Sequence, residues 1–326
     1  MNYFLGIDMG GSGIKMAITD EKAQILDKTS IEMNLKADPK TILSQTLSEA
    51  SKLKFYDKVK AAGFGSAGDI DYKKGVLRYA YNLPQWKNVP VKRLLQKMSG
   101  REVFMDNDAN IAALGAFWID LKGKCENLIC ITLGTGIGGG IIANKKIYRG
   151  SSGSAGEIGH ISIKFDGTPC NCGNIGCAEA YLGGKNFQNY CRDYLKDKKD
   201  ALVKSMTDGK ISNLTIEILY EAALKKDKEA LFLWRYYGEK LGVLIASVLN
   251  ILNPDCIVFC GGLSKAHNFF EKSMKEEIAK RAFKTPAKIC RIIFSKYSNV
   301  LGSVGAAMLP NHQKQKKQRR CRQDMR

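Results

Sequence analysis

Residues 3–20, YFLGIDMGGSGIKMAITD, decide the fold of this chain. Two apolar runs stand on either side of a glycine-rich turn, and this pattern predicts a strand, a tight turn and a second strand. Residues 23–33, AQILDKTSIEM, predict a third extended segment directly afterwards. Three consecutive strands with short connections form an antiparallel meander.

The same pattern returns at residues 127–147, NLICITLGTGIGGGIIANKKI. Gly134, Gly136 and Gly139 satisfy the spacing G-x-G-x-x-G, but a dinucleotide-binding fingerprint must open a helix after its strand. Here the residues after the glycines, IIANKKI, predict another strand, so that interpretation fails. The chain is instead interpreted as two halves that begin alike, without being a tandem repeat.

The remaining pattern alternates helices and strands, which indicates an α/β protein. Pro39 opens a helix, residues 58–68 and 101–106 predict strands, and residues 108–119 predict a helix. A mostly helical region, 184–252, precedes a buried strand at 256–260. No linker rich in Pro or Ser divides the chain. The expected organisation is an N-terminal α/β domain at 1–117, joined by a C-terminal helix at about 300–310, a larger α/β domain at 118–299, and a basic tail at 311–326.

The composition is that of an ordinary soluble protein, with 326 residues, 44% hydrophobic and 25% charged. Ten cysteines would suggest disulfides in a small secreted chain, but the N-terminus lacks a basic leader segment and Asp8 interrupts its apolar run. We expect a cytoplasmic protein with reduced thiols and no membrane span.

The formal net charge of +19 raises nucleic acid as a possible partner. After Pro310, seven Lys or Arg stand against one Asp, so the tail carries +6 and leaves +13 for residues 1–310. The tail shows no apolar periodicity and is predicted to be disordered. A solvated extension is the favoured interpretation, and binding of a polyanion such as RNA is the open alternative.

The first glycine turn has the features of an anion site. Its glycines let backbone N–H groups approach a phosphate, Ser12 adds a hydroxyl, and Lys15 adds charge. Asp8, at the end of the first strand, is suited to hold a hydrated Mg²⁺. The alternative is a simple hairpin turn. Two such loops at equivalent places in two halves are suited to grip a polyphosphate.

Three polar residues, Asp106, Asn107 and Asp108, stand at a junction from strand to helix. Phosphorylation of an alcohol needs a carboxylate that orients the hydroxyl and takes its proton, and a strand-end Asp can do this. The alternative is a helix N-cap, which Asn and Asp favour. An N-cap explains one of the three residues.

Residues 156–179, GEIGHISIKFDGTPCNCGNIGCAE, hold one histidine and three cysteines. His160, Cys170, Cys172 and Cys177 form a ligand set for closed, tetrahedral, structural zinc. The alternative is that the cysteines are free thiols packed in a core, but the residues between them are poorly suited to a core. Such a metal would hold Glu157 and Glu179 rigidly, and two fixed carboxylates suggest recognition of sugar hydroxyls.

These motifs resemble the ROK family of sugar kinases and related repressors. The matches are DMGGS, NLPQW, NDAN, LGTGIGGG, GEIGH, CNCGNIGCAE and FCGGLS, in family order. The resemblance implies the actin-like, ribonuclease-H-like ATPase fold, with two α/β domains and a cleft between them. It also implies ATP and Mg²⁺ as cosubstrate, and a hexose or an N-acetylhexosamine as acceptor.

The resemblance also implies roles for single residues. Asp108 is expected to be the general base, and Gly261 and Gly262 are expected near the adenosine. The expected phosphate loops are Gly6–Gly13 and Gly134–Ile141, with Gly6, Asp8, Gly10, Gly11, Ser12, Gly13, Lys15, Gly134, Thr135, Gly136, Gly138 and Gly139 as contacts. The expected sugar contacts are Asn82, Asn107, Asp108, Glu157, His160 and Glu179, and His160 would also bind zinc through its other ring nitrogen.

Two functional classes remain open, a kinase and a sugar-sensing binding protein. Repressors of the family carry a helix-turn-helix segment ahead of the first kinase strand, whereas here that strand starts at Tyr3, so no DNA-binding domain is expected. Glucose is the first choice of acceptor, followed by N-acetylmannosamine, N-acetylglucosamine, allose and fructose. GSAG at 65–68 departs from the family's G-x-P-G, which weakens the expected sugar contact there. The family commonly forms dimers or tetramers.

Overall fold

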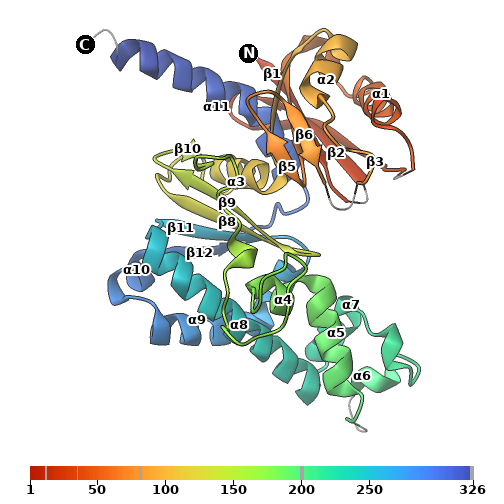
Figure 1. The fold of residues 1–326 in the computed structure, drawn as a ribbon, viewed down its shortest axis with the longest axis vertical. Helices are drawn as coiled ribbons and strands as arrows, with labels where there is room; N and C mark the ends of the chain where they lie inside the picture. Colours follow the sequence, from red (N-terminus) through yellow and green to blue (C-terminus); the bar gives the residue numbers. More distant parts are fainter. Residues whose placement is uncertain (12, 35, 81–82, 199–201, 324–326) are drawn as a thin grey trace. The chain divides into compact units, whose positions relative to one another are not determined.

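The structure is a computed structural model, and it describes residues 1–11, 13–34, 36–80, 83–198 and 202–323. The chain divides into two compact units (Figure 1). Unit 1 contains residues Met1–Cys130, Gly140–Gly156 and Tyr297–Arg326, and unit 2 contains residues Ile131–Gly139 and Glu157–Lys296.

The first sheet has five strands in the order β3-β2-β1-β4-β7. Its first three strands pair antiparallel, which confirms the predicted meander, and the other two pairs are parallel. The antiparallel register places Asp8 opposite Lys15. The strands are β1 (Tyr3–Met9), β2 (Gly13–Asp20), β3 (Ile25–Glu32), β4 (Val59–Ser66) and β7 (Glu102–Asn107).

The last helix of the chain packs directly against this sheet. A Cβ atom on Gly6 would lie 1.8 Å from the carbonyl oxygen of Ser303, and one on Gly63 would lie 1.8 Å from that of Ala306. Glycine on both strands therefore allows the helix backbone to approach, as the small residues of LGSVGAAML predict. The helices of unit 1 are α1 (Pro39–Ala50), η1 (Tyr56–Lys58), α2 (Val91–Ser99), α3 (Asp108–Ile119) and α11 (Leu301–Gln323), and a separate hairpin is made by β5 (Asp69–Asp71) and β6 (Val76–Tyr79).

The second sheet repeats the strand order of the first, as β10-β9-β8-β11-β12. In both sheets the first three strands in the sequence lie next to one another, and two later strands extend the sheet from the earliest strand. This order confirms that the two halves begin alike. The strands are β8 (Leu128–Leu133), β9 (Ile137–Ala143), β10 (Lys146–Ile147), β11 (Cys256–Cys260) and β12 (Arg291–Phe294).

The core of unit 2 is helical and aromatic. Trp234 and Tyr237, on the long helix α8, are fully buried and contact Phe270 of α9. A Cβ atom on Gly238 would lie 2.3 Å from the carbonyl oxygen of Phe270, so the two helices pack closely. The helices are η2 (Ile158–His160), α4 (Ala178–Leu182), α5 (Gly184–Leu195), α6 (Leu202–Ser205), η3 (Ile211–Asn213), α7 (Ile216–Leu224), α8 (Lys228–Leu252), η4 (Leu263–Ala266), α9 (His267–Arg281) and α10 (Lys284–Ile289).

The last helix, α11, runs past Pro310 and continues through Gln323. Its buried hydrophobic residues lie at its start, between Leu301 and Leu309. The solvated character of the basic tail after Pro310 stays a prediction. Across the described ranges, no helix combines the length and apolar character needed to cross a membrane.

Candidate active site and metal centre

Asp8 stands near the end of β1, where the first glycine turn begins. The turn is closed by a hydrogen bond of 2.9 Å from the N–H of Gly10 to the carbonyl oxygen of Gly13. A Cβ atom on Gly302 would lie 2.1 Å from Asp8 Oδ2, so the carboxyl group lies against the start of α11. Loss of contact with water, followed by the charge of Asp108, raises the pKa of Asp8 to about 7, while Lys15 acts in the opposite direction.

Asp108 is the first residue of α3 and follows β7 directly. Asn107 is the N-cap, and its side-chain oxygen accepts the N–H of Ala109 at 2.9 Å. Desolvation raises the pKa of Asp108, and hydrogen bonds from the helix start oppose the rise. The N-cap interpretation is therefore correct for Asn107, while Asp108 Oδ1 also accepts the N–H of Ala109 at 2.9 Å.

Unit 1 thus brings together part of the predicted set. The charge of Asp108 contributes to the raised pKa of Asp8, and both carboxyl groups belong to the same unit. Lys15 lies opposite Asp8 in the β1–β2 register. A Cβ atom on Gly11 would meet nothing within 4 Å. A Cβ atom on Gly13 would lie 2.9 Å from the carbonyl oxygen of Ile31, so a larger residue would not fit there. Ser12 and Asn82, two predicted contacts, lie outside the described residues.

In unit 2 the second glycine loop carries its own hydrogen bonds. The N–H of Gly134 donates to the carbonyl oxygen of Gly136 at 3.1 Å, and the N–H of Gly138 donates to Thr132 Oγ1 at 3.0 Å. The N–H of Ile137 donates to Glu179 Oε2 at 2.8 Å. The loop is therefore anchored to a residue that the sequence placed among the sugar contacts.

The other predicted nucleotide contacts of unit 2 lie at the same end of the sheet. Gly261 follows β11 with φ +96°, and a Cβ there would lie 2.4 Å from the carbonyl oxygen of Leu133, just before the glycine loop. The carbonyl oxygen of Thr135 lies close to Gly183, and open space surrounds Gly262. Glycine is thus required at position 261 by both the backbone conformation and the packing there.

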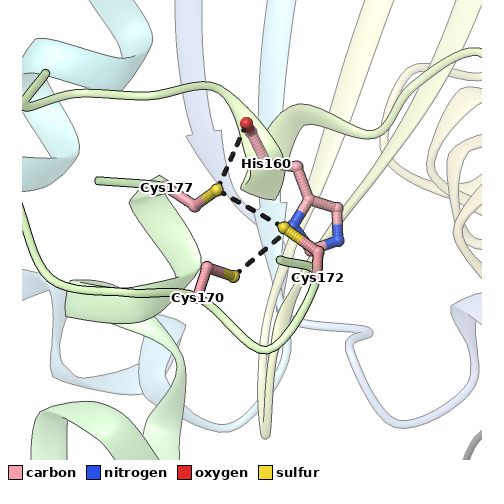
Figure 2. A group of neighbouring side chains, drawn as sticks. All are labelled: His160, Cys170, Cys172 and Cys177. Atoms are coloured by element: carbon pink, nitrogen blue, oxygen red, sulfur yellow. Dashed lines mark hydrogen bonds between the residues drawn. The ribbon is translucent and has the colours of Figure 1, made fainter. Parts of the chain in front are cut away.

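The predicted metal ligands form one cluster (Figure 2). Their ligand atoms all lie within 4.8 Å of one another. Cys170 Sγ lies 3.8 Å from His160 Nδ1, and Cys172 Sγ lies 3.7 Å from Cys177 Sγ. In a tetrahedral site with zinc–sulfur bonds of about 2.3 Å, neighbouring sulfur atoms are about 3.8 Å apart. One His and three Cys at these spacings fit zinc in a closed structural site.

The pKa values of two thiols of the cluster are shifted in opposite directions. Cys177 is completely buried, and burial together with the neighbouring thiols raises its pKa to about 12. A cysteine binds a metal as thiolate, so a cation of high charge density would have to stabilise the deprotonated form. A backbone N–H at Asn174, and then Cys170, lower the pKa of Cys172.

Backbone geometry folds the segment that carries the ligands. The N–H of Cys170 donates to the carbonyl oxygen of Asn174 at 2.8 Å, which closes the turn around Cys172. Gly176 has φ +73°, and a Cβ there would lie 1.7 Å from the carbonyl oxygen of Lys164, so glycine is required. Tyr181 of α4 accepts the N–H of Thr168 at 2.7 Å and ties the loop to the helix.

His160 has two differently used ring nitrogens. Nδ1 faces Cys170, while Nε2 lies 3.9 Å from Glu157 Oε2. The Glu157 side chain is 67% exposed, so it can reach a ligand in solution. Nδ1 is therefore the ring nitrogen that belongs to the cluster, and the contacts of His160 and Glu157 with a sugar stay predictions.

Sequence reasoning missed the partner of Asp106. Arg149, in the loop after β10, forms a buried ion pair with this carboxylate. The only sign of this pair in the sequence was an arginine between a strand and the GEIGH segment. Asp106 lies 43 positions earlier, and no local pattern connects the two residues.

Comparison with known proteins identifies the family. The model of the ROK family matches residues 4–313. The glucokinase of Halalkalibacterium halodurans is 34% identical over 318 residues, which cover 95% of this chain and 96% of the relative. A putative xylose repressor of Caldicellulosiruptor sp. is 32% identical over 317 residues, which cover 93% of this chain and 77% of the repressor.

A solved structure extends the similarity to three dimensions. A ROK family glucokinase from Streptomyces griseus, in complex with glucose and AMPPNP, superposes with a TM-score of 0.79 at 28% identity. The superposition covers 94% of this chain and 99% of that protein. The mixed α/β sheets and this similarity confirm the predicted actin-like, ribonuclease-H-like fold. With the family model matching almost the whole length, the chain belongs to the ROK family.

Proposed function

We propose that this protein is an ATP-dependent sugar kinase that transfers the γ-phosphoryl group of ATP to a hexose, with glucose as the first candidate acceptor. The observation that carries the proposal is Asp108, a carboxyl group with a raised pKa at the junction of β7 and α3. The similarity to glucokinases over nearly the full length supports the same activity.

In the proposed mechanism Asp108 accepts the proton of the sugar hydroxyl. The hydroxyl oxygen forms a bond to the γ-phosphorus while the bond from that phosphorus to the bridging oxygen of ADP breaks. Backbone N–H groups of the loops at Gly6–Gly13 and Gly134–Ile141 bind the phosphates, and Lys15 adds positive charge. Mg²⁺, when bound, offsets the charge of the phosphates, and Asp8 is the residue suited to hold its hydration shell.

The acceptor is held by hydrogen-bonding side chains whose types suit vicinal hydroxyl groups. Asn107 offers an amide, while Glu157 and Glu179 offer carboxylates, which accept strong charge-assisted hydrogen bonds. We assign sugar contacts to Asn82, Asn107, Asp108, Glu157, His160 and Glu179. Gly261 and Gly262 are assigned to the adenosine side of the nucleotide.

We further propose that the cluster of one His and three Cys binds structural Zn²⁺. The spacing of its sulfur and nitrogen atoms supports this assignment. Four protein ligands leave no coordination position for water or substrate, so the metal would act through folding. Its expected effect is to hold the segment from Glu157 to Glu179.

A sugar-responsive binding protein is the second candidate. It is favoured by the similarity to a putative xylose repressor, which is 32% identical over 317 residues. A binding protein would bind a sugar without turnover of ATP, so catalysis separates the two candidates. A cytoplasmic location and a homodimer or homotetramer remain predictions for either of them.

The experiment is a steady-state assay of ADP release with Mg·ATP and each of five sugars: glucose, N-acetylmannosamine, N-acetylglucosamine, allose and fructose. The proposal expects turnover of at least one sugar, and the highest kcat/KM for glucose. Sugar binding by calorimetry without turnover of any of the five would favour the binding protein. A higher kcat/KM for another sugar would keep the kinase and change its acceptor.

A further inference from the structure

We propose that Arg149 is a positioning residue for phosphoryl transfer, which acts by holding Asp106 so that Asn107 and Asp108 keep their places at the junction of β7 and α3. The inference rests on the proposed function, in which Asp108 takes the proton of the sugar. Arg149 itself is not assigned any contact with substrate.

The Asp106 carboxylate accepts four hydrogen bonds, two on each oxygen. Its Oδ2 accepts Arg149 Nε at 2.9 Å and also accepts Nη2 of the same guanidinium. Its Oδ1 accepts the side-chain N–H of Asn110 at 2.8 Å and the backbone N–H of Asn107 at 3.0 Å. All ordinary acceptor positions of the carboxylate are therefore used, and none is left for a substrate.

These hydrogen bonds connect Arg149 to residues on either side of Asp108, the proposed base. Asp106 accepts the backbone N–H of Asn107, the residue directly before Asp108. It also accepts the side-chain amide of Asn110, in the first turn of α3. A shift of Asp106 would therefore move both sides of Asp108. Displacement of a catalytic group by about 1 Å can cost about a hundredfold in rate.

The pair is deeply buried, which makes each partner dependent on the other. The side chains of Arg149 and Asp106 are 8% and 2% exposed. A buried charge that loses its partner cannot be compensated by water, so the remaining group will move or take up a proton. A surface pair in the same unit, Arg78 with Asp69, is 41% and 25% exposed and lacks this dependence.

The loop that carries Arg149 is itself held in place. The guanidinium lies over the ring of Tyr72, with its Cζ atom 4.5 Å from the ring centroid. The N–H of Ala155 donates to the carbonyl oxygen of Arg149 at 3.1 Å, so the residues from 149 to 155 close into a compact turn. The Tyr72 ring and the turn at 149–155 thus hold Arg149 in addition to its ion pair with Asp106.

The test compares Arg149→Met and Arg149→Lys with wild-type protein. Met keeps much of the side-chain length and removes the donors, so kcat should fall about a hundredfold, while the KM for ATP changes less than about threefold. Lys retains one cationic donor without the planar fork, so it should recover part of the lost kcat. Rates are measured at a temperature where circular dichroism shows each variant folded.

Arg101 supplies a matched control in the same unit. Its guanidinium also lies over a tyrosine, Tyr56, at 4.2 Å, and donates to the carbonyl oxygens of Tyr56 and Val59. Arg101→Met should lower the melting temperature and leave kcat within about twofold of wild type. Asp106→Asn should lower kcat, and adding it to Arg149→Met should cost little more, because the two residues act as one unit.

The outcomes separate the inference from the function on which it rests. Wild-type protein without activity toward any sugar would reject the proposed kinase. If the wild type is active, then a folded Arg149→Met with kcat within about threefold of wild type overturns the positioning role. If Arg149→Met does not fold, Arg149→Lys decides, and full wild-type kcat in that variant also overturns the role. Equal losses of kcat in the Arg149 and Arg101 variants would show that Arg149 contributes only to the general stability of the unit.

Discussion

Glu179 Oε2 accepts a hydrogen bond of 2.8 Å from the backbone N–H of Ile137. The glutamate belongs to the first turn of α4, two residues after Cys177, and the isoleucine begins β9 after the glycine loop. One carboxylate therefore links the end of the segment proposed to bind zinc to a loop proposed to bind phosphate. Its other oxygen, Oε1, is the one to which we assign the sugar hydroxyl.

Glu179→Gln should raise the sugar KM by about 10- to 150-fold and change the ATP KM little. A hydrogen bond to a charged group contributes roughly 1.5–3 kcal/mol, which the amide loses. The amide oxygen still accepts the N–H of Ile137, so the glycine loop keeps its place. Glu179→Ala is the comparison, and it should raise the ATP KM as well. Reduced zinc content of Glu179→Gln with a normal sugar KM would instead make Glu179 a support of the metal segment.

Gly136→Ala should also raise the sugar KM, although Gly136 belongs to the glycine loop. The added Cβ would lie 2.3 Å from Glu179 Oε2, so the carboxylate must move. The expected increase is roughly tenfold, at the lower end of the range for loss of a charged hydrogen bond. Gly134→Ala is the control, because a Cβ there meets nothing within 4 Å, and its sugar KM should stay near wild type. Equal sugar KM values for the two variants would contradict the link.

The protein should contain about one tightly bound zinc per chain, and Cys172→Ser should reduce that content sharply. Three remaining ligands cannot close the tetrahedral site that structural zinc requires. Mass spectrometry of the purified metal content gives the measurement, and Cys191→Ser, outside the cluster, is the control. Brief chelation should reduce activity only as zinc leaves. Absence of zinc after purification without chelators would reject the assignment.

Asp8 should make stability depend on pH. Its pKa is about 7 in the folded protein and near 3.8 in the unfolded chain, so both states are protonated only well below pH 3.8, where the residue costs nothing. As the pH rises toward 7, the unfolded chain releases the proton first, and the folded state loses stability. Asp8→Asn, which stays neutral, should therefore raise the melting temperature by roughly 3 °C at pH 8 and change it little at about pH 3.

Thermal unfolding without nucleotide or Mg²⁺ provides the measurement for Asp8. Asp71→Asn is a useful contrast, because a backbone N–H and Arg78 lower the pKa of Asp71. That substitution should not give a gain at pH 8. A melting-temperature difference for Asp8→Asn that is the same at both pH values would show that the raised pKa does not control stability.

Features formed by residues close together in the sequence could be predicted. The two meanders follow from the spacing of apolar residues and glycines, and the cluster of one His and three Cys follows from side chains that lie within one short segment. Local chemistry decides these features, because each turn or ligand set is complete within a few tens of residues.

Features that depend on tertiary contact could not be predicted. Nothing near Arg149 in the sequence points to Asp106, and nothing near Glu179 points to the N–H of Ile137. In both cases the deciding partner comes from an element that is distant in the sequence, which periodicity and composition do not report.

Asp108→Asn tests the central claim most directly. The amide keeps the size of the side chain and can still form hydrogen bonds, but it cannot take the hydroxyl proton, so kcat should fall about 10²- to 10⁴-fold. Glucose binding, measured by calorimetry, should stay within about fivefold of wild type. The measurement is the rate of glucose 6-phosphate formation from glucose and Mg·ATP by the wild type and the variant, with the product identified by mass spectrometry. The account predicts rapid formation by the wild type and almost none by the variant. Retention of more than about a tenth of the wild-type kcat in Asp108→Asn would contradict it.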